Sequence, residues 1–124
     1  MGLELLAVVI GLATFAPQLQ YYAINIWEDN HGGECALTKA CARESDHNLL
    51  VHAVWLMAAR CGMALWVQRV ASDDNIADEP SRGKNSALAE INAQWVSPEL
   101  PSQIWHPDQW TGIALEFAAN SSVA

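Results

Sequence analysis

The chain has 124 residues, of which 52% are hydrophobic and 16% charged, so it has the size of one folded domain and enough apolar material for a core. Its 6 Lys and Arg against 14 Asp and Glu give a net charge of −8, which excludes a protein that binds nucleic acid through its overall field. The 3 cysteines cannot all pair and form no CxxC motif, which favours free thiols and an intracellular location, cytoplasmic or nuclear.

The chain opens with an apolar run over residues 2–16, which predicts a helix ended by Pro17. The run has the character of a secretory signal, but no Lys or Arg precedes it and Glu4 lies inside it. It is also shorter than the roughly 20 apolar residues that span a bilayer. We therefore expect a buried helix, in a protein without a membrane segment.

The middle of the chain predicts an α/β fold. A strand, two helices and a second strand are expected in that order, at residues 21–28, 34–42, 45–60 and 64–70. Ser45 or Asp46 is the expected N-cap of the longer helix and Gly62 its end. This spacing is typical of a βαβ unit, so the two strands should be parallel, with crossover helices between them.

The composition changes after Arg82. A polar turn over 71–75 and a short helical segment at 76–79 precede Pro80, and further prolines interrupt the segment that follows. We expect a domain at 1–83 and a Pro- and Trp-containing extension at 84–124, with weak helices near 84–92 and 111–119.

Three acidic residues are predicted to lie near one another. Glu4 lies in the first helix, Asp29 at the carboxyl end of the first strand and Asp78 after the second, and ligands of open parallel sheets bind at the carboxyl ends of strands. Carboxylates gathered without Lys or Arg repel one another unless a hard divalent cation such as Mg²⁺ neutralises them. With 14 acidic residues, a chance arrangement stays open at this point.

Residues 66–83, WVQRVASDDNIADEPSRG, resemble the end of the ribonuclease H domain that follows reverse transcriptase in retrotransposon polyproteins. That family has a pattern of the kind R-V-x-S-x-x-N-x-A-D-x-P-S-R, and this chain supplies Arg69, Val70, Ser72, Asn75, Ala77, Asp78, Pro80, Ser81 and Arg82. Asp29 in IWEDN is similar to the family's strand-end aspartate, and Glu4 in LELLAVV to the glutamate of its first helix. The resemblance covers residues 2–83.

The resemblance implies a metal-dependent endonuclease that cuts the RNA strand of an RNA–DNA hybrid, with Glu4, Asp29 and Asp78 holding two Mg²⁺ or Mn²⁺ ions. The family's fold opens with a three-strand meander that carries the first catalytic aspartate, and nothing before Glu4 matches it. Glu28, beside Asp29 on a strand, should face the other way. We therefore expect a partial, N-terminally truncated ribonuclease H-like fold that is inactive unless other segments, such as the rest of a reverse transcriptase polyprotein, complete it.

Candidate contacts to the nucleic acid are His31, close to Asp29, Lys39 and Arg43 on one helix face, and Arg69 in the motif. Surface solvation is the alternative role for Lys39 and Arg43. The cysteines and the other histidines lack the paired spacing of structural zinc sites, so we expect surface histidines and buried cysteines. The tryptophans in regular elements, Trp27, Trp55 and Trp66, are expected in the core.

A function of another class stays open. The strand at 21–28 would have an unpaired edge, and edge strands pair readily with other chains. A non-catalytic acidic α/β module that binds a protein partner through this edge and the Trp-rich tail is the alternative. A nuclease site should bind Mn²⁺ through Asp29 and Asp78, whereas such a module need not.

Overall fold

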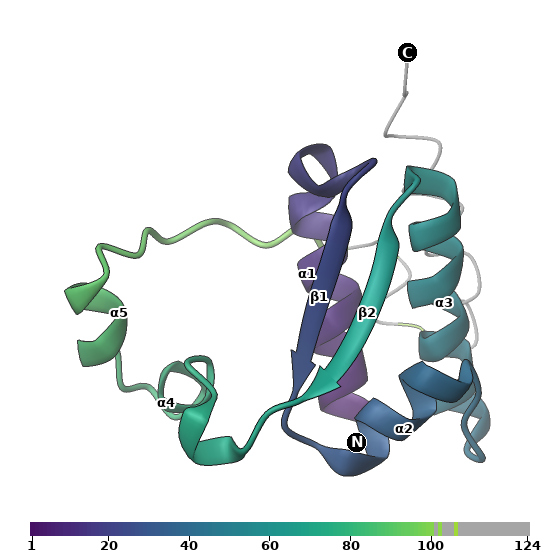
Figure 1. The fold of residues 1–124 in the computed structure, drawn as a ribbon, viewed down its shortest axis with the longest axis horizontal. Helices are drawn as coiled ribbons and strands as arrows, with labels where there is room; N and C mark the ends of the chain where they lie inside the picture. Colours follow the sequence, from purple (N-terminus) through teal and green to yellow (C-terminus); the bar gives the residue numbers. More distant parts are fainter. Residues whose placement is uncertain (101, 103–105, 107–124) are drawn as a thin grey trace.

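The computed structural model describes residues 1–100, 102 and 106, and it is a mixed α/β fold (Figure 1). The elements, in chain order, are α1 (Gly2–Leu19), β1 (Ala23–Glu28), α2 (His31–Lys39), α3 (Ser45–Cys61), β2 (Ala64–Arg69), the 3-10 turn η1 (Ser72–Asp74), α4 (Asp78–Ser81) and α5 (Ser86–Glu90). The strands β1 and β2 are parallel, and Ala23 pairs with Ala64 at one end and Glu28 with Arg69 at the other. The predicted α/β class, with two parallel strands joined by helices, is confirmed.

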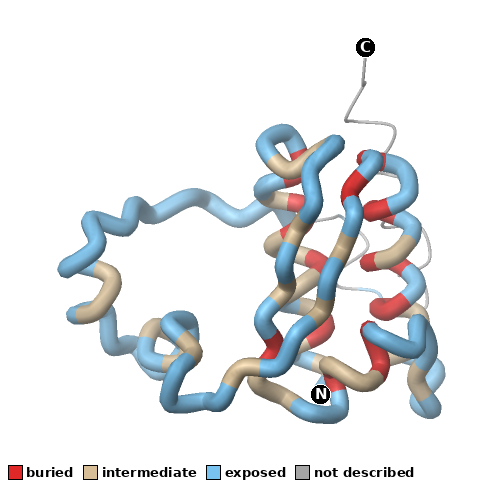
Figure 2. The backbone as a smooth tube through the Cα atoms, viewed as in Figure 1, coloured by how far each residue is buried: buried red, intermediate tan, exposed pale blue. Residues whose placement is uncertain are grey.

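The core lies between the sheet and the helices. α1 and α3 pack against each other, and alternate residues of both strands face them, so Ile24, Leu65 and Val67 contact the core. Figure 2 shows the buried residues on the inner faces of these helices, and the largest fully buried side chains are Leu5, Val9, Leu37, Leu50, Val51, Val54 and Met57. The described core is thus one helical layer on one two-stranded sheet.

Several element ends differ from the prediction. α1 continues through Pro17 to Leu19: the proline lacks an N–H and removes one hydrogen bond, but the turn beyond it persists, since the Gln20 N–H donates to the Ala16 carbonyl oxygen at 3.0 Å. α2 begins at His31 rather than residue 34, because the Asn30 side chain caps it by accepting a hydrogen bond of 2.9 Å from the Gly33 N–H. α3 has Glu44 as its N-cap, and it ends at Gly62 as predicted, with φ of 65°.

The apolar helix α1 is long enough and hydrophobic enough to cross a membrane by length and composition alone. In the structure its residues Leu5, Val9, Leu12, Ala13 and Ala16 are buried. These residues place one face of α1 in the core beside α3, whereas Leu3 (81% exposed) and Phe15 (42% exposed) lie outside it, so the expected buried helix is buried on one face.

The sheet has a second face that carries exposed aromatic side chains. Trp27 is 56% exposed and Trp66 is 65% exposed, so the expectation that both lie in the core is wrong. Strand residues alternate between faces, and in the described part of the chain the core covers the face that holds Ile24 and Val67. Trp55 is half-buried against the core, and its indole N–H donates to the Leu37 carbonyl oxygen at 2.9 Å.

The chain beyond β2 leaves the core and then returns to it (Figure 1). The elements η1, α4 and α5 contain no buried residue. The segment after α5 comes back to α1, where the Glu99 N–H donates to the Thr14 hydroxyl oxygen at 2.9 Å. The expected helix at 111–119 lies outside the described residues.

Candidate functional site

One cavity contains all three predicted carboxylates. It has a volume of about 500 Å³, and its acidic lining residues are Glu4, Glu28, Asp29 and Asp78. We call it the acidic cavity. Glu4 comes from the first turn of α1, Asp29 from just beyond β1 and Asp78 from the start of α4. The structure therefore brings together side chains that are far apart in the sequence.

Asn75 joins the two sides of the acidic cavity. Its side-chain amide donates to the Asp29 carboxylate at 2.9 Å, and its side-chain oxygen accepts from the Ala77 N–H at 3.1 Å. Asn75 also lines the cavity. The turn after β2 is thus fixed against the end of β1, which places Asp78 on the same side of the molecule as Asp29.

Glu28 is the site residue that sequence reasoning missed. It lines the same cavity, so the expectation that it faces away from Asp29 is wrong. The physical reason is that β1 ends at Glu28, and strict alternation does not extend beyond the strand. The position of Glu28 in the strand could have predicted its burial. Ile24 faces the core, and a residue four positions further along the same strand faces the core too.

The carboxyl group of Glu28 is held in a buried position with few partners. The residue is only 5% exposed, and its carboxylate accepts a hydrogen bond of 3.1 Å from the Asn30 N–H. Burial raises the pKa of Glu28; the Asn30 hydrogen bond opposes this, and the charges of Asp29 and Glu4 add to the increase.

The remaining carboxylates have partners within the chain. The Glu4 carboxylate lies 3.1 Å from the amino group of Met1. The pKa of Glu4 is lowered, mainly by a hydrogen bond from its own backbone N–H and then by a hydrogen bond from the Met1 amino group. Asp78 forms an ion pair with Arg82, the C-cap residue of the one-turn helix α4. Neither Lys nor Arg is among the described residues that line the acidic cavity. Among the described residues, Glu28 and Asp29 are therefore the two lining carboxylates without a cationic partner.

The acidic cavity offers oxygen donors, but among the described residues no three of its carboxylates have ligand atoms within 4.8 Å of one another. Its potential ligands are carboxylate oxygens and the amide oxygen of Asn75, and Mg²⁺ and Mn²⁺ prefer oxygen ligands. Mg²⁺ takes few protein ligands and keeps several waters, which leaves room for the oxygens of a phosphate. A cation held there would offset the charges of Glu28 and Asp29, since Glu4 and Asp78 already have cationic partners.

The predicted nucleic-acid contacts lie outside this cavity. His31 and Arg69 lie together, with 3.3 Å between Arg69 Nη1 and His31 Nδ1. Lys39 is the exposed last residue of α2. Arg43 does not share its helix face, because Ala40 adopts a left-handed conformation that ends α2. Comparison of the chain with protein-family models, curated proteins and solved structures gives no match.

Proposed function

We propose that the acidic cavity binds Mg²⁺ or Mn²⁺, and that the chain is a ribonuclease H-like domain of a retroelement whose substrate is the RNA strand of an RNA–DNA hybrid. One observation carries the proposal. The three carboxylates that the resemblance selects, Glu4, Asp29 and Asp78, line a single cavity although they come from three separate elements. An intracellular location, where such hybrids and free thiols occur together, fits this function.

Each residue has a role in this proposal. Glu4, Asp29 and Asp78 hold the cations, and Asn75 positions Asp29. When bound, such ions supply an activated water and stabilise the attacking and leaving oxygens of a phosphodiester. His31 and Arg69 contact phosphates of the hybrid outside the cavity, while exposed Lys39 and Arg43 extend the contact along the backbone.

The proposal includes a partner. The family's first catalytic aspartate has no counterpart among the 124 residues, so we expect residues 1–124 alone to bind cations without cutting the hybrid efficiently. Within the described part of the chain, β1 pairs with β2 and has its other edge open. A strand of the rest of a reverse transcriptase polyprotein, pairing along that edge, would supply the missing carboxylate.

Mn²⁺ binding tests the proposal directly. Calorimetric titration should show weak binding to the wild-type chain and at least a roughly tenfold loss of affinity in Asp29→Asn and Asp78→Asn, since each removes a charged ligand. Glu90→Gln is the matched control, because Glu90 is an exposed acidic residue of α5 that does not line the acidic cavity. Equal affinity in all four proteins would refute a cation site at the acidic cavity.

A cleavage assay tests the need for a partner. Labelled RNA–DNA hybrid incubated with residues 1–124 and Mg²⁺ should remain intact. Robust cleavage that Asp29→Asn abolishes would support the nuclease function and contradict the requirement for an added strand.

One feature favours the second candidate function, a protein-interaction module. Trp27 of β1 and Trp66 of β2 lie exposed on the open face of the sheet, and Trp27 belongs to the strand with the open edge. Exposed aromatic side chains are typical of contact surfaces between proteins. This function predicts no Mn²⁺ binding that depends on Asp29 or Asp78, so the titration above distinguishes the two.

A further inference from the structure

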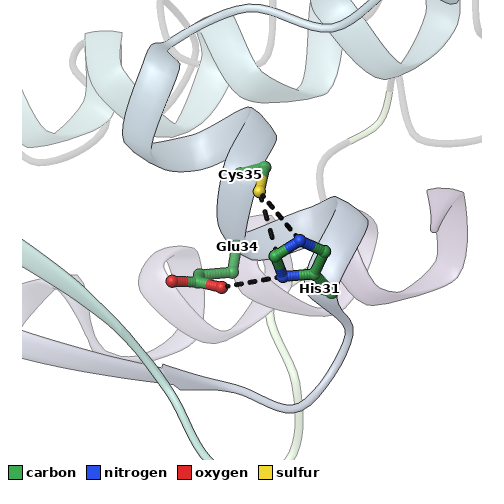
Figure 3. A group of neighbouring side chains, drawn as sticks. All are labelled: His31, Glu34 and Cys35. Carbon is green, nitrogen blue, oxygen red and sulfur yellow. Dashed lines mark hydrogen bonds and ion pairs between the residues drawn. The ribbon is translucent and has the colours of Figure 1, made fainter.

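A second cluster of potential metal ligands lies on α2, outside the acidic cavity. His31, Glu34 and Cys35 each offer one ligand atom, and these atoms lie within 4.8 Å of one another (Figure 3). Their positions, i, i+3 and i+4, place the three side chains on one face of the helix. We propose that this His–Glu–Cys cluster is a Zn²⁺ site, a proposal that does not rest on the function assigned to the acidic cavity.

The distances are close to those of a tetrahedral site. Zinc bonds of about 2.0 to 2.3 Å imply separations of about 3.3 Å between nitrogen and oxygen ligands and about 3.6 Å between nitrogen and sulfur ligands. His31 Nδ1 lies 3.4 Å from Glu34 Oε2 and 4.0 Å from Cys35 Sγ. The nitrogen and oxygen are therefore at the separation of two zinc ligands. The sulfur has a few tenths of an ångström to move toward Nδ1, and it lies within 4.8 Å of the Glu34 oxygen.

The side chains have the freedom to make that movement. The His31 side chain is 68% exposed and the Glu34 side chain 26% exposed. Cys35 is half-buried. Small rotations of these side chains close the cluster around an ion without a change in the helix backbone.

The donor set selects the type of metal. An imidazole nitrogen, a thiolate and a carboxylate together suit Zn²⁺, whereas Mg²⁺ prefers oxygen ligands alone. Three protein ligands leave a fourth position for a water molecule, as in open zinc sites. Since none of the three residues lines the acidic cavity, the molecule has two cation sites of different chemistry.

The spacing of cysteines and histidines did not reveal this site, because one ligand is a glutamate. The other residues of that kind in the same region are Cys41, His47 and His52, and none of them belongs to the cluster. Cys41 is exposed and Cys61 is buried, so Cys35 is the described cysteine with both solvent access and neighbouring ligands.

Arg69 opposes the ion. Its Nη1 lies 3.3 Å from His31 Nδ1, the ring nitrogen that also lies 3.4 Å from the Glu34 carboxylate. An ion therefore has to displace the guanidinium and remain near its charge. Removing that charge should strengthen metal binding, which is the opposite of what a structural role for Arg69 predicts.

Co²⁺ titration followed by visible absorption tests the site, because a thiolate ligand gives a charge-transfer band that carboxylates do not. The wild-type chain should show this band together with the absorption of four-coordinate Co²⁺, and Zn²⁺ should remove both. Cys35→Ser should abolish the band and His31→Ala should weaken binding at least about tenfold. The matched controls are Cys41→Ser and His52→Ala, which change exposed residues outside the cluster and should keep the wild-type spectrum.

Arg69→Gln completes the test and should raise the affinity for Co²⁺ by about threefold to tenfold, the effect of removing a nearby unit charge in a solvated site. Asp29→Asn and Asp78→Asn should leave the sulfur band unchanged, so failure of the acidic cavity and failure of this site are distinguishable. The proposal would be overturned by any of three results: no sulfur band in the wild-type chain, equal loss of the band in Cys35→Ser and Cys41→Ser, or weaker Co²⁺ binding in Arg69→Gln.

Discussion

Replacing Glu28 by Gln is expected to stabilise the fold at neutral pH. Glu28 is 5% exposed, and the hydrogen bond that its carboxylate accepts comes from the Asn30 N–H at 3.1 Å. Gln has nearly the same shape and keeps an acceptor oxygen for that bond, but it has no charge. The substitution therefore removes the repulsion from Asp29 and Glu4 and the cost of burying an anion.

The sign of the pH dependence follows from the direction of the pKa. Burial raises the pKa of Glu28. Between the unfolded-state pKa and the folded-state pKa, the carboxyl group is therefore protonated in the folded protein and ionised in the unfolded chain. Above the folded-state pKa, the buried charge lowers the free energy of unfolding by its full amount. This loss of stability disappears as the pH falls toward the unfolded-state pKa. We expect Glu28→Gln to add on the order of 1 kcal/mol at pH 7, the usual scale for an incompletely paired buried polar group. The gain should vanish near a pH of about 4.

Urea unfolding followed by circular dichroism, in buffer containing a chelator, measures this difference. Glu79→Gln is the control, since Glu79 is exposed on α4 and its substitution should change stability by less than about 0.5 kcal/mol. A loss of stability in Glu28→Gln at pH 7 would show that the charged form of Glu28 stabilises the fold. A gain that persists unchanged at low pH would show that the effect does not come from the charge, and either result would refute this reasoning.

Two further substitutions test the packing by thermal or urea unfolding. Gly62→Ala should destabilise the fold by more than about 1 kcal/mol, because φ is 65° and the new Cβ would lie 2.7 Å from the Tyr21 ring. Gly83→Ala should destabilise it less, because Gly83 has a φ of 79° but no neighbour within 4 Å. Equal losses of stability would contradict the contact with Tyr21. Leu50→Ala removes a side chain that is 0% exposed and should cost about 3 to 5 kcal/mol, whereas a similar loss in Leu56→Ala, 44% exposed, would contradict the assigned core.

Local patterns predicted most of the fold. The β-branched run before Glu28 and the Gly62 helix end indicate a strand and a helix through backbone preferences that the structure retains. Trp27 and Trp66 were placed wrongly in the core, because hydrophobicity does not tell how many faces of a sheet are covered. That number depends on tertiary packing, which a single strand's sequence does not contain.

The residues of the candidate sites also divide into those that the sequence predicted and those that depend on details of the fold. Asp29 and Asp78 follow strands, so the topology of a parallel sheet was enough to predict that they lie near one another. Glu28 was missed because alternation was applied across the end of β1. Glu34 was missed because its role in the His–Glu–Cys cluster depends on helix register, and α2 begins three residues before the predicted start.

The central claim is that the acidic cavity holds a divalent cation, and paramagnetic broadening by Mn²⁺ in amide NMR spectra of the full chain tests it most directly. At low Mn²⁺ concentrations, the first signals to broaden should be those of residues that line the cavity, such as Leu3, Ala7, Asn75 and Ala77. Asp78→Ala should abolish this pattern. Broadening that begins elsewhere, such as at the exposed acidic turn η1, while the cavity signals stay sharp, would contradict the claim.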